Sequence, residues 1–371
     1  MSAKDHFHNY LEQKLQERYE KGLMRTLVHR RDKIDFSSND YFGLSSSPAY
    51  LFLNKNNRSG ATGSRSISGN MDEAEEAEYI IAEYHNQEAA LIFNSGYAAN
   101  VGLFSCIASK GETYISDEYI HASIIDGMRL SHANRLKFKH NDLLDLEHKL
   151  RQTIGRKFVA VESIYSMDGD AAPLIEIAAL CNQYDALLIV DEAHATGVFG
   201  ARGEGLVCQY GLESEVLTCV YTYGKAAGIH GAAVVGSNIL RNHLISNAPS
   251  IVFSTALPPH TYEQIKTAYS LFPFLDREFL FDLIQHFRNA AANLHSLVFL
   301  DSVSPIQGII IGDNFKAKAL AQYLSDKGYF IRAILSPTVP VGRERLRICL
   351  HTFNSKSQID DLLNEINSFL S

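Results

Sequence analysis

The sequence predicts an α/β protein built around a mostly parallel sheet, and two apolar segments carry this prediction. Residues 186–190 are apolar and are followed directly by Asp191, while the apolar residues 216–221 precede Lys225 by a short turn. Short apolar runs bounded by polar residues are typical of strands buried in parallel sheets. Ligands of such sheets bind outside the carboxyl ends of the strands. We therefore expect the Asp191 carboxylate and the Lys225 amine to meet at one edge of the sheet.

A lysine close to a carboxylate suits chemistry on carbonyl compounds. Lysine forms Schiff bases with carbonyl groups, and pyridoxal 5'-phosphate (PLP) needs such a lysine and an acid that pairs with its ring nitrogen. Acids and lysines at strand ends are also common in other α/β proteins, and a lysine in a glycine-rich turn can instead bind phosphate. The two residues here lie 34 positions apart, within DEAHATGVFG and TYGKAAG, and this combination favours PLP.

Composition places the chain among ordinary globular proteins and argues against several other classes. Its 371 residues suggest about two domains, with 46% hydrophobic residues and a net charge of −8. The negative charge argues against nucleic-acid binding, and neither a membrane-spanning run nor a signal peptide is expected. The cysteines are odd in number and form no CxxC pair, so we expect free thiols, no metal site and a cytoplasmic protein. They are Cys106, Cys181, Cys208, Cys219 and Cys349.

Segments along most of the chain resemble the α-oxoamine synthases, a family within the fold-type I PLP enzymes. The similarity runs from about Asp35 to the C-terminus and includes FSSNDYFGL, SRSISGN, FNSGYAAN, ESIYSMDGD, DEAHATGVFG, TYGKAAG, FSTALPP and PTVPVG. The resemblance implies a PLP-dependent transferase with a large domain, whose mostly parallel sheet is seven-stranded, and a smaller α+β C-terminal domain. We expect an N-terminal helix and connector over residues 1–36, the large PLP-binding domain over 37–265 and the small domain over 266–371.

The resemblance implies a role for each residue around the cofactor ring. Lys225 holds PLP through a Schiff base and later moves protons at the substrate α-carbon. Asp191 keeps the ring nitrogen protonated, because a nearby carboxylate favours the charged ring. His194 and Ser166 hydrogen-bond the ring hydroxyl, and His121 stacks on the ring. Without the resemblance, an isolated histidine such as His121 is more often an ordinary surface or capping residue.

Further cofactor residues are implied near the phosphate. Gly96 and Tyr97 start a helix whose free N–H groups suit an anion, although the same turn is also an ordinary helix start. Thr222 is expected at the phosphate, and Glu162 belongs to the cofactor site. In FSTALPP we expect a strand ended by paired prolines, with Thr255 reaching the phosphate of the neighbouring subunit. The resemblance therefore implies a homodimer with shared active sites.

The substrate residues implied by the resemblance are Arg25, Asn39, Thr338 and Arg347. A planar guanidinium suits an amino-acid carboxylate, and the family's position in LRICL falls on Arg347. Arg345 remains the alternative, because alternate residues of a strand share a face and spacing does not separate the two. Asn39 and Thr338 also suit simple turns, and Arg25 suits a solvated surface.

The implied reaction is the decarboxylative condensation of an amino acid with an acyl-CoA or acyl-ACP thioester. SRSISGN and PTVPVG favour the branch that joins L-alanine to a pimeloyl thioester, whereas Met71 stands near the place where the family usually has a histidine. One alternative is an α-oxoamine synthase that uses glycine or serine with another acyl-CoA. A catalytically silent partner subunit is a second, and Lys225 argues against it. A nicotinamide-dependent dehydrogenase is disfavoured, because no GxGxxG opens a helix after the first strand.

Overall fold

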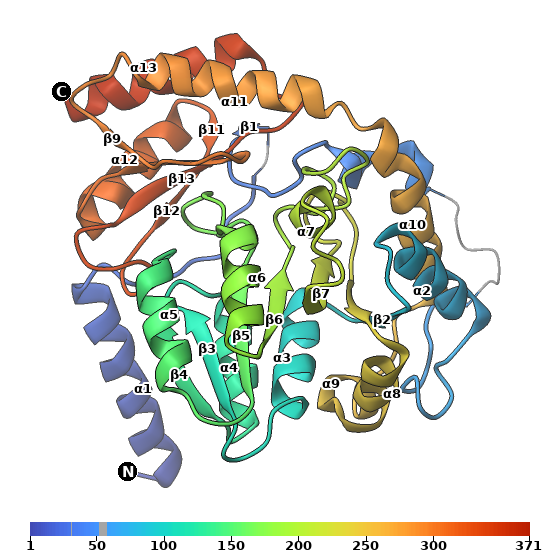
Figure 1. Cartoon of the computed structure of the whole chain (residues 1–371). Helices are drawn as coiled ribbons and strands as arrows, with labels where there is room; N and C mark the ends of the chain where they lie inside the picture. Colours follow the sequence, from blue (N-terminus) through green and yellow to red (C-terminus); the bar gives the residue numbers. More distant parts are fainter. Residues whose placement is uncertain (31, 52–57) are drawn as a thin grey trace. The chain divides into compact units, whose positions relative to one another are not determined.

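The chain forms two compact units in a computed structural model that describes residues 1–30, 32–51 and 58–371 (Figure 1). The large unit comprises Asn39–Ser166 and Asp170–Arg277. The small unit comprises Met1–Ser38, Met167–Gly169 and Glu278–Ser371. The short segment Met167–Gly169 thus leaves the large unit and returns to it, which sequence pattern alone does not indicate.

The large unit contains a seven-stranded sheet in the order β2-β8-β7-β6-β5-β3-β4. Only β8 runs antiparallel to its neighbours, so the mostly parallel sheet predicted from the sequence is confirmed. The strands are β2 (Ala89–Phe93), β3 (Thr113–Asp117), β4 (Asn134–Phe138), β5 (Lys157–Glu162), β6 (Ala186–Asp191), β7 (Val216–Thr222) and β8 (Ala232–Gly236). The two apolar runs noted first in the sequence are β6 and β7, and both end at the polar residues expected.

Helices cover the sheet on both faces. Buried side chains from α3, α4, α8 and α9 form one hydrophobic core with Phe158, Ile189 and Val220 of the central strands. Figure 1 shows α5 and α6 on the opposite face. The helices are α2 (Asp72–Tyr84), α3 (Gly96–Cys106), α4 (Ala122–Leu130), α5 (Leu143–Gln152), α6 (Leu174–Gln183), α7 (Leu206–Gln209), α8 (Asn238–Asn247), α9 (Pro249–Val252) and α10 (Pro259–Leu271).

The prediction of a strand in FSTALPP is wrong. The segment instead connects the end of α9 at Val252 to the start of α10 at Pro259. Pro259 occupies the first turn of α10, where a proline's missing N–H costs nothing because that group has no intrahelical partner. The paired prolines therefore start a helix and do not end a strand.

The small unit contains a four-stranded sheet in the order β12-β13-β10-β9 and a two-stranded pair of β1 with β11. Its strands are β1 (Ile34–Asp35), β9 (Val298–Phe299), β10 (Ile306–Ile310), β11 (Tyr329–Phe330), β12 (Arg332–Ile334) and β13 (Arg345–Cys349). Its helices are α1 (Ala3–Glu20), α11 (Arg277–Ala291), α12 (Asn314–Asp326) and α13 (Lys356–Leu370). The separate smaller sheet is the one expected, and Ser355 and Gln358 form the capping box that starts α13.

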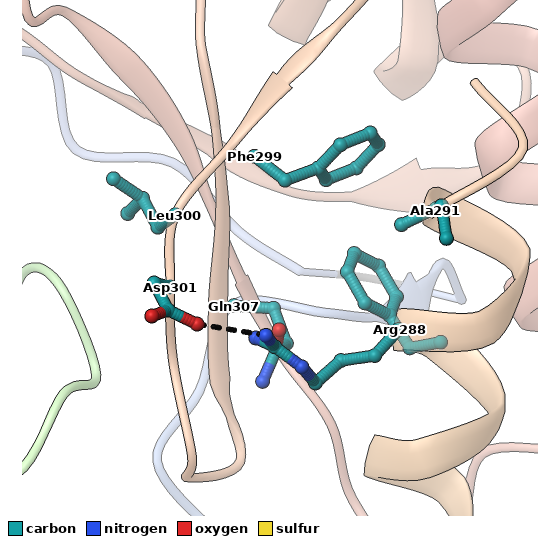
Figure 2. A pocket seen from close by; sticks show the side chains of 8 residues that line it. Arg288, Ala291, Phe299, Leu300, Asp301 and Gln307 are labelled. Atoms are coloured by element: carbon teal, nitrogen blue, oxygen red, sulfur yellow. Dashed lines mark hydrogen bonds and ion pairs between the residues drawn. The ribbon is translucent and has the colours of Figure 1, made fainter. Parts of the chain in front are cut away.

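A cavity of about 220 Å³ lies within the small unit, between α11 and the strands β9 and β10 (Figure 2). Phe287, Phe299 and Leu300 supply much of its apolar lining. Arg288 donates to Asp301 at 2.8 Å and to the carbonyl oxygen of Ser302 at 2.6 Å. The cation at this cavity is therefore already neutralised by its neighbours.

Two general features concern membranes and metals. Among the residues that the structure describes, no helix is both long and apolar enough to cross a membrane. Within the same residues, no group of three or more His, Cys, Asp or Glu side chains is placed to hold a metal ion.

Candidate active site

A second cavity, of about 310 Å³, lies in the large unit at the carboxyl ends of its strands. It brings together eight residues singled out from the sequence, namely Asn39, Gly96, Tyr97, His121, Glu162, Asp191, Thr222 and Lys225. It is also lined by residues that the sequence did not single out, namely Ser95, Asn100, Ser123, Ala193, Gly224, His230 and Gly231. Of the other predicted site residues, Ser166, His194 and Thr255 belong to the large unit but do not line this cavity, and Arg25, Thr338 and Arg347 belong to the small unit.

The alternation of side chains along three strands explains why the site forms here. Phe158, Ile189 and Val220 face the core formed with α3 and α4. Residues two or four positions further along a strand point to the same face, so Glu162, Asp191 and Thr222 all emerge on the side where α3 and α4 begin. The strand ends and these helix starts therefore converge on one cavity.

Asp191 is held in a fixed orientation at the end of β6. Its Oδ2 accepts a hydrogen bond of 2.8 Å from the Asn100 side chain, and its Oδ1 accepts one of 3.0 Å from the backbone N–H of Ala193. Asn100 lies one helical turn after Gly96, a spacing that puts both residues on one face of α3. This spacing in GYAAN is the signal that could have revealed Asn100, which the sequence analysis missed.

His121 caps the start of α4 and is linked to Asp191 through two intermediates. Its Nδ1 accepts from the backbone N–H of Ser123 at 3.3 Å and lies 2.7 Å from the Ser123 hydroxyl. That hydroxyl accepts from Asn100 at 3.0 Å. Burial lowers the pKa of His121. The charge of Lys225 lowers this pKa further, whereas the charge of Asp191 raises it. Since Nδ1 is an acceptor, His121 is a neutral ring with its proton on Nε2.

Glu162 is a buried carboxyl group at the end of β5. Its Oε2 accepts from the backbone N–H of Ser166 at 3.1 Å, whereas its buried Oε1 has no hydrogen-bond partner within the described part of the chain. Burial raises its pKa to about 8, with Asp191 adding to the rise and Lys225 opposing it. Glu162 therefore holds a proton at neutral pH, and its unpartnered oxygen marks a position for a ligand's polar atom.

The turn before α3 approaches β7 very closely. A Cβ atom on Gly96 would lie 2.6 Å from Cγ2 of Thr222, so only glycine fits there. Ser95 caps the helix by accepting from the backbone N–H of Ala98 at 3.2 Å. The first N–H groups of a helix have no intrahelical partner, and both Gly96 and Thr222 line the cavity. The arrangement suits an anion.

Two predicted cofactor residues lie close to this cavity without lining it. The Nδ1 atom of buried His194 is 2.7 Å from the hydroxyl of Tyr41, a residue that sequence reasoning missed within FSSNDYFGL. Thr255 is exposed, and Asn94 donates to its carbonyl oxygen at 2.8 Å. Asn94 immediately precedes Ser95, so the Thr255 loop is attached beside the start of α3.

The two arginines of β13 have different surroundings in the small unit. Arg345 is 1% exposed and forms an ion pair of 2.8 Å with Asp168. Arg347 donates through Nη1 to the sulfur of Cys349 at 2.8 Å. The charge of Arg345 is thus used to hold the Met167–Gly169 segment. Elsewhere in this unit, Arg25 and Thr338 meet in a weak hydrogen bond of 3.4 Å.

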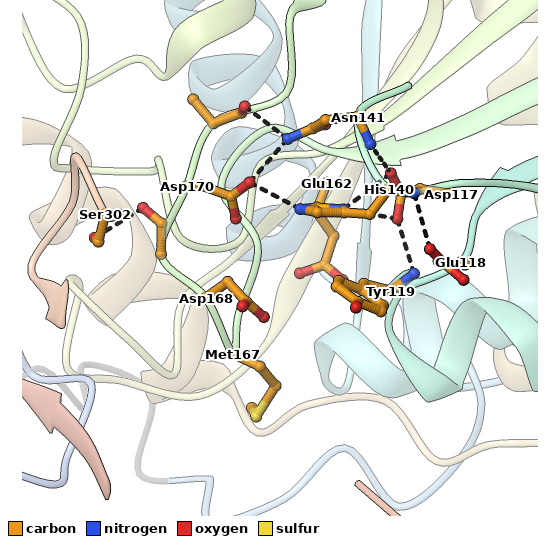
Figure 3. A network of polar contacts seen from close by, with 12 residues as sticks. Asp117, Glu118, Tyr119, His140, Asn141, Glu162, Met167, Asp168, Asp170 and Ser302 are labelled. Atoms are coloured by element: carbon orange, nitrogen blue, oxygen red, sulfur yellow. Dashed lines mark hydrogen bonds and ion pairs between the residues drawn. The ribbon is translucent and has the colours of Figure 1, made fainter. Parts of the chain in front are cut away.

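A network of polar and charged side chains joins the segments that follow β3, β4 and β5 (Figure 3). His140 lies 3.0 Å from Asp117 at the end of β3 and 2.8 Å from Asp170 in the loop after β5. Burial disfavours the charged ring, but the hydrogen bonds and charges of the two aspartates outweigh it and raise the pKa of His140 to about 10. The imidazolium therefore joins three strand ends, because His140 itself follows β4. The sequence analysis did not single it out.

Comparisons with known proteins agree with this geometry. The sequence model of the family "aminotransferase class I and II" matches residues 31–366 of this chain. The 8-amino-7-oxononanoate synthase of Emericella nidulans is 40% identical, over 97% of this chain and 95% of that protein. A high-resolution structure of serine palmitoyltransferase with PLP has a TM-score of 0.88 and 26% identity, covering 100% of this chain and 98% of that one. For the 8-amino-7-oxononanoate synthase of Francisella tularensis the TM-score is 0.78 and the identity 29%, with coverage of 91% and 98%.

The chain belongs to the α-oxoamine synthases, within the aminotransferase class I and II family. The fold-type I architecture expected from the sequence is thereby confirmed.

The groups around the cavity of this α-oxoamine synthase fit PLP. Lys225 provides an amine, and Asp191 provides a buried carboxylate fixed by two donors. The unpartnered Oε1 of Glu162 and Oδ1 of Asn100 are buried polar atoms that a ligand can satisfy. The glycine turn at Gly96 leaves room for a phosphate. The aldehyde, the ring nitrogen and the phosphate of PLP therefore each have a chemically matching group in one cavity.

Proposed function

We propose that this α-oxoamine synthase condenses L-alanine with a pimeloyl thioester, of CoA or acyl carrier protein, to form 8-amino-7-oxononanoate, a step of biotin biosynthesis. A bond forms between the alanine α-carbon and the thioester carbonyl carbon, the carbon–sulfur bond breaks, and the alanine carboxylate leaves as carbon dioxide. The observation that carries the proposal is the meeting of Lys225 and Asp191 in one cavity of a chain 40% identical, over almost its full length, to an 8-amino-7-oxononanoate synthase.

The cofactor of this reaction is PLP. When bound, PLP supplies an electron sink that stabilises negative charge at the substrate α-carbon. Lys225 attaches the cofactor and then removes and returns protons at that carbon. Asp191, oriented by Asn100, holds a proton on the ring nitrogen. His121 presents a neutral, flat ring to stack on the cofactor, and protonated Glu162 donates a hydrogen bond within the same cavity.

Two further groups of residues complete the proposed cofactor site. His194, held by Tyr41, and Ser166 bind the ring hydroxyl. Gly96, Tyr97 and Thr222 bind the phosphate at the start of α3. Thr255 of the partner subunit adds another phosphate ligand, so the functional protein is a homodimer with two shared sites. The exposure of Thr255 supports this role, because an exposed side chain is available to another subunit.

Substrate binding is assigned to Arg347 of β13, the position of LRICL that matches the carboxylate-binding arginine of the family. Arg347 binds the alanine carboxylate, because Arg345 already pairs with Asp168. Asn39, which lines the cavity, contacts the substrate next to the cofactor. Arg25 and Thr338 contact the acyl part, and their mutual hydrogen bond supports a shared role.

A second candidate is an α-oxoamine synthase that takes serine or glycine with a different acyl-CoA. The likeness to serine palmitoyltransferase favours it, since that structure matches this chain with the higher of the two TM-scores quoted above, 0.88 against 0.78. Sequence identity favours the alanine reaction, at 40% against 26%. Cavity geometry does not separate the two, because the reacting groups are shared.

Product mass spectrometry tests the proposal. The purified protein with PLP is incubated with alanine, glycine or serine and a panel of acyl-CoA chain lengths. The expected product is 8-amino-7-oxononanoate from alanine and pimeloyl-CoA, in large excess over the others. A long-chain aminoketone from serine would instead establish the second candidate.

We also propose that the protein works in the cytoplasm. All five cysteines are free thiols in the structure, as expected for a protein of a reducing compartment.

A further inference from the structure

His230 is a cavity-lining residue to which neither the sequence motifs nor the proposed reaction assigns a role. It lies five positions after Lys225, lines the same cavity and has an exposed side chain. Within residues 1–30, 32–51 and 58–371, its imidazole forms no hydrogen bond or ion pair. Both ring nitrogens therefore remain available to a ligand.

The strand register fixes where His230 lies. Ala232 begins β8 and pairs with Phe93 at the end of β2 and with Thr222 at the end of β7. His230 precedes Ala232 by two residues, so it lies where these two strands end. From there β2 leads through Ser95 to the start of α3, and β7 leads to the turn that carries Lys225.

The backbone around His230 is held by close contacts. The carbonyl oxygen of Gly231 accepts from the backbone N–H of Tyr223 at 3.0 Å. Gly231 has a φ of +110°, a conformation that glycine adopts readily and other residues do not. A Cβ atom there would also lie 3.2 Å from Leu257. The same Cβ atom would lie 3.5 Å from the carbonyl oxygen of Phe93 at the end of β2, so the turn that carries His230 is held close to the strand that leads to Ser95 and α3.

The charged residues that line the cavity include few groups that could bind a phosphate. Among its lining residues Lys225 is the only lysine or arginine, and in the proposed function Lys225 is attached to the cofactor. His121 is neutral and bonded to Ser123, while Glu162 and Asp191 are acids. A phosphate monoester carries up to two negative charges, and a helix start offsets only about half of one. Another hydrogen-bond donor at this edge would bind it more tightly.

We propose that His230 binds the phosphate group of PLP, together with the start of α3 and Thr222. This assignment rests on the proposed function, in which PLP occupies the cavity. The imidazole donates a hydrogen bond through a ring N–H to a phosphate oxygen. The acyl-CoA substrate also carries phosphates, but the register places His230 beside the helix start that suits the smaller, buried anion.

Cofactor binding by the full-length chain tests this assignment. Dissociation constants for PLP, for pyridoxal without phosphate and for CoA are measured with the wild type, His230→Ala, His230→Lys and His295→Ala. His295 is an exposed histidine of the small unit and serves as the matched control. His230→Ala is expected to weaken PLP binding about threefold to tenfold, as for loss of one charge-assisted hydrogen bond at a partly solvated site. Pyridoxal and CoA binding stay unchanged, His230→Lys restores PLP binding, and His295→Ala equals the wild type.

Several results would overturn the assignment. PLP binding that is unchanged in His230→Ala removes any role for His230, and an equal loss for pyridoxal indicates packing and not phosphate binding. A loss confined to CoA assigns the imidazole to the phosphates of the acyl carrier instead. If the wild type itself binds no PLP, both this proposal and the proposed function fail, whereas tight wild-type binding with an unaffected alanine variant overturns this proposal alone.

Discussion

The large unit and the small unit each contain a cavity, and the polar groups around the two cavities differ in state. In the small unit Arg288 is neutralised by Asp301, and Gln307 donates to Ser302 and Ser304. In the large unit the buried Oε1 of Glu162 and Oδ1 of Asn100 have no partner among the described residues. Leaving such atoms unpaired is costly. The difference teaches that, of these two cavities, the one lined by Lys225 and Asp191 is also the one that leaves buried polar atoms for a ligand to satisfy.

The two arginines of β13 differ in their neighbours within one strand. Arg345 and Arg347 are both buried, and their side chains leave the same face. Arg345 is neutralised by Asp168, so its charge serves the small unit's own structure. The proposed substrate contact therefore falls on Arg347, and the two variants are expected to fail in different ways.

The strongest test of the large-unit cavity removes its amine. Lys225→Ala is expected to lose activity by more than about a thousandfold, because no other group lining the cavity can attach PLP and move the α-proton. Borohydride reduction of the wild type with PLP, followed by peptide mapping, should place the pyridoxyl group on Lys225. Lys110→Ala is the control and keeps wild-type activity. A pyridoxyl group on any other lysine would refute the site.

Neutralising Asp191 should separate binding from turnover. Asp191→Asn keeps the shape of the side chain but cannot hold a proton on the ring nitrogen. PLP is expected still to bind, as followed by its absorbance, while kcat falls by at least about 100-fold, or ~2.7 kcal/mol. Activity within tenfold of the wild type would mean that Asp191 is not the acid paired with the cofactor ring.

The arginine comparison can be tested with a matched pair of variants. Arg347→Ala is expected to raise the KM for alanine by about 10- to 100-fold, since it removes a bidentate carboxylate contact. Arg345→Ala leaves the half-buried Asp168 with only its longer ion pair to Arg343, at 3.8 Å, and should lower the free energy of unfolding by about 2 kcal/mol. Urea unfolding and steady-state kinetics measure both effects. If Arg345→Ala raises the KM and Arg347→Ala does not, the assignment is reversed.

The raised pKa of Glu162 predicts a pH-dependent cost in stability. Its folded pKa is about 8, above the unfolded value near 4.3, so the folded state binds more protons between these values and its stability falls as the pH rises through them. Glu162→Gln mimics the protonated acid and removes this dependence. Without cofactor, the variant should gain about 1–3 kcal/mol on the wild type between pH 5.5 and pH 8, measured by urea unfolding. Parallel pH profiles for the two proteins would show that Glu162 is ionised.

The smallest expected effect concerns the dimer. Thr255→Ala should weaken PLP retention by about threefold, as for one phosphate hydrogen bond, and leave Lys225 untouched. A complementation experiment is more decisive. Inactive Lys225→Ala and inactive Thr255→Lys proteins are mixed under conditions of subunit exchange, so that one site of each hybrid dimer contains both native residues. Hybrid dimers should regain one working site. No recovery despite proven exchange, or a fully active monomer in sedimentation, would refute shared sites.

The sequence by itself determined the sheet, its strand ends and the residues at those ends. An apolar run such as residues 186–190 predicts from its own residues that the strand is buried. The polar residue that follows such a run marks where the strand ends. Asp191 and Thr222 are the last residues of their strands in the structure. The wrong strand before α10 shows the limit of this reasoning, because prolines suit a helix start as well as a strand end.

Only the tertiary structure decided which groups remain unsatisfied and which are already paired. Asn100 meets Asp191 from another element, 91 positions away. Arg345 and Arg347 point to the same face of β13, so the sequence does not tell their roles apart. The ion pair of Arg345 with Asp168 does, and it forms because the segment of Asp168 belongs to the small unit. His230 reaches the cavity through the register of β8 against two strands. Such pairings depend on long-range contacts and burial, and these follow from the packing of whole elements and not from any local pattern of residues.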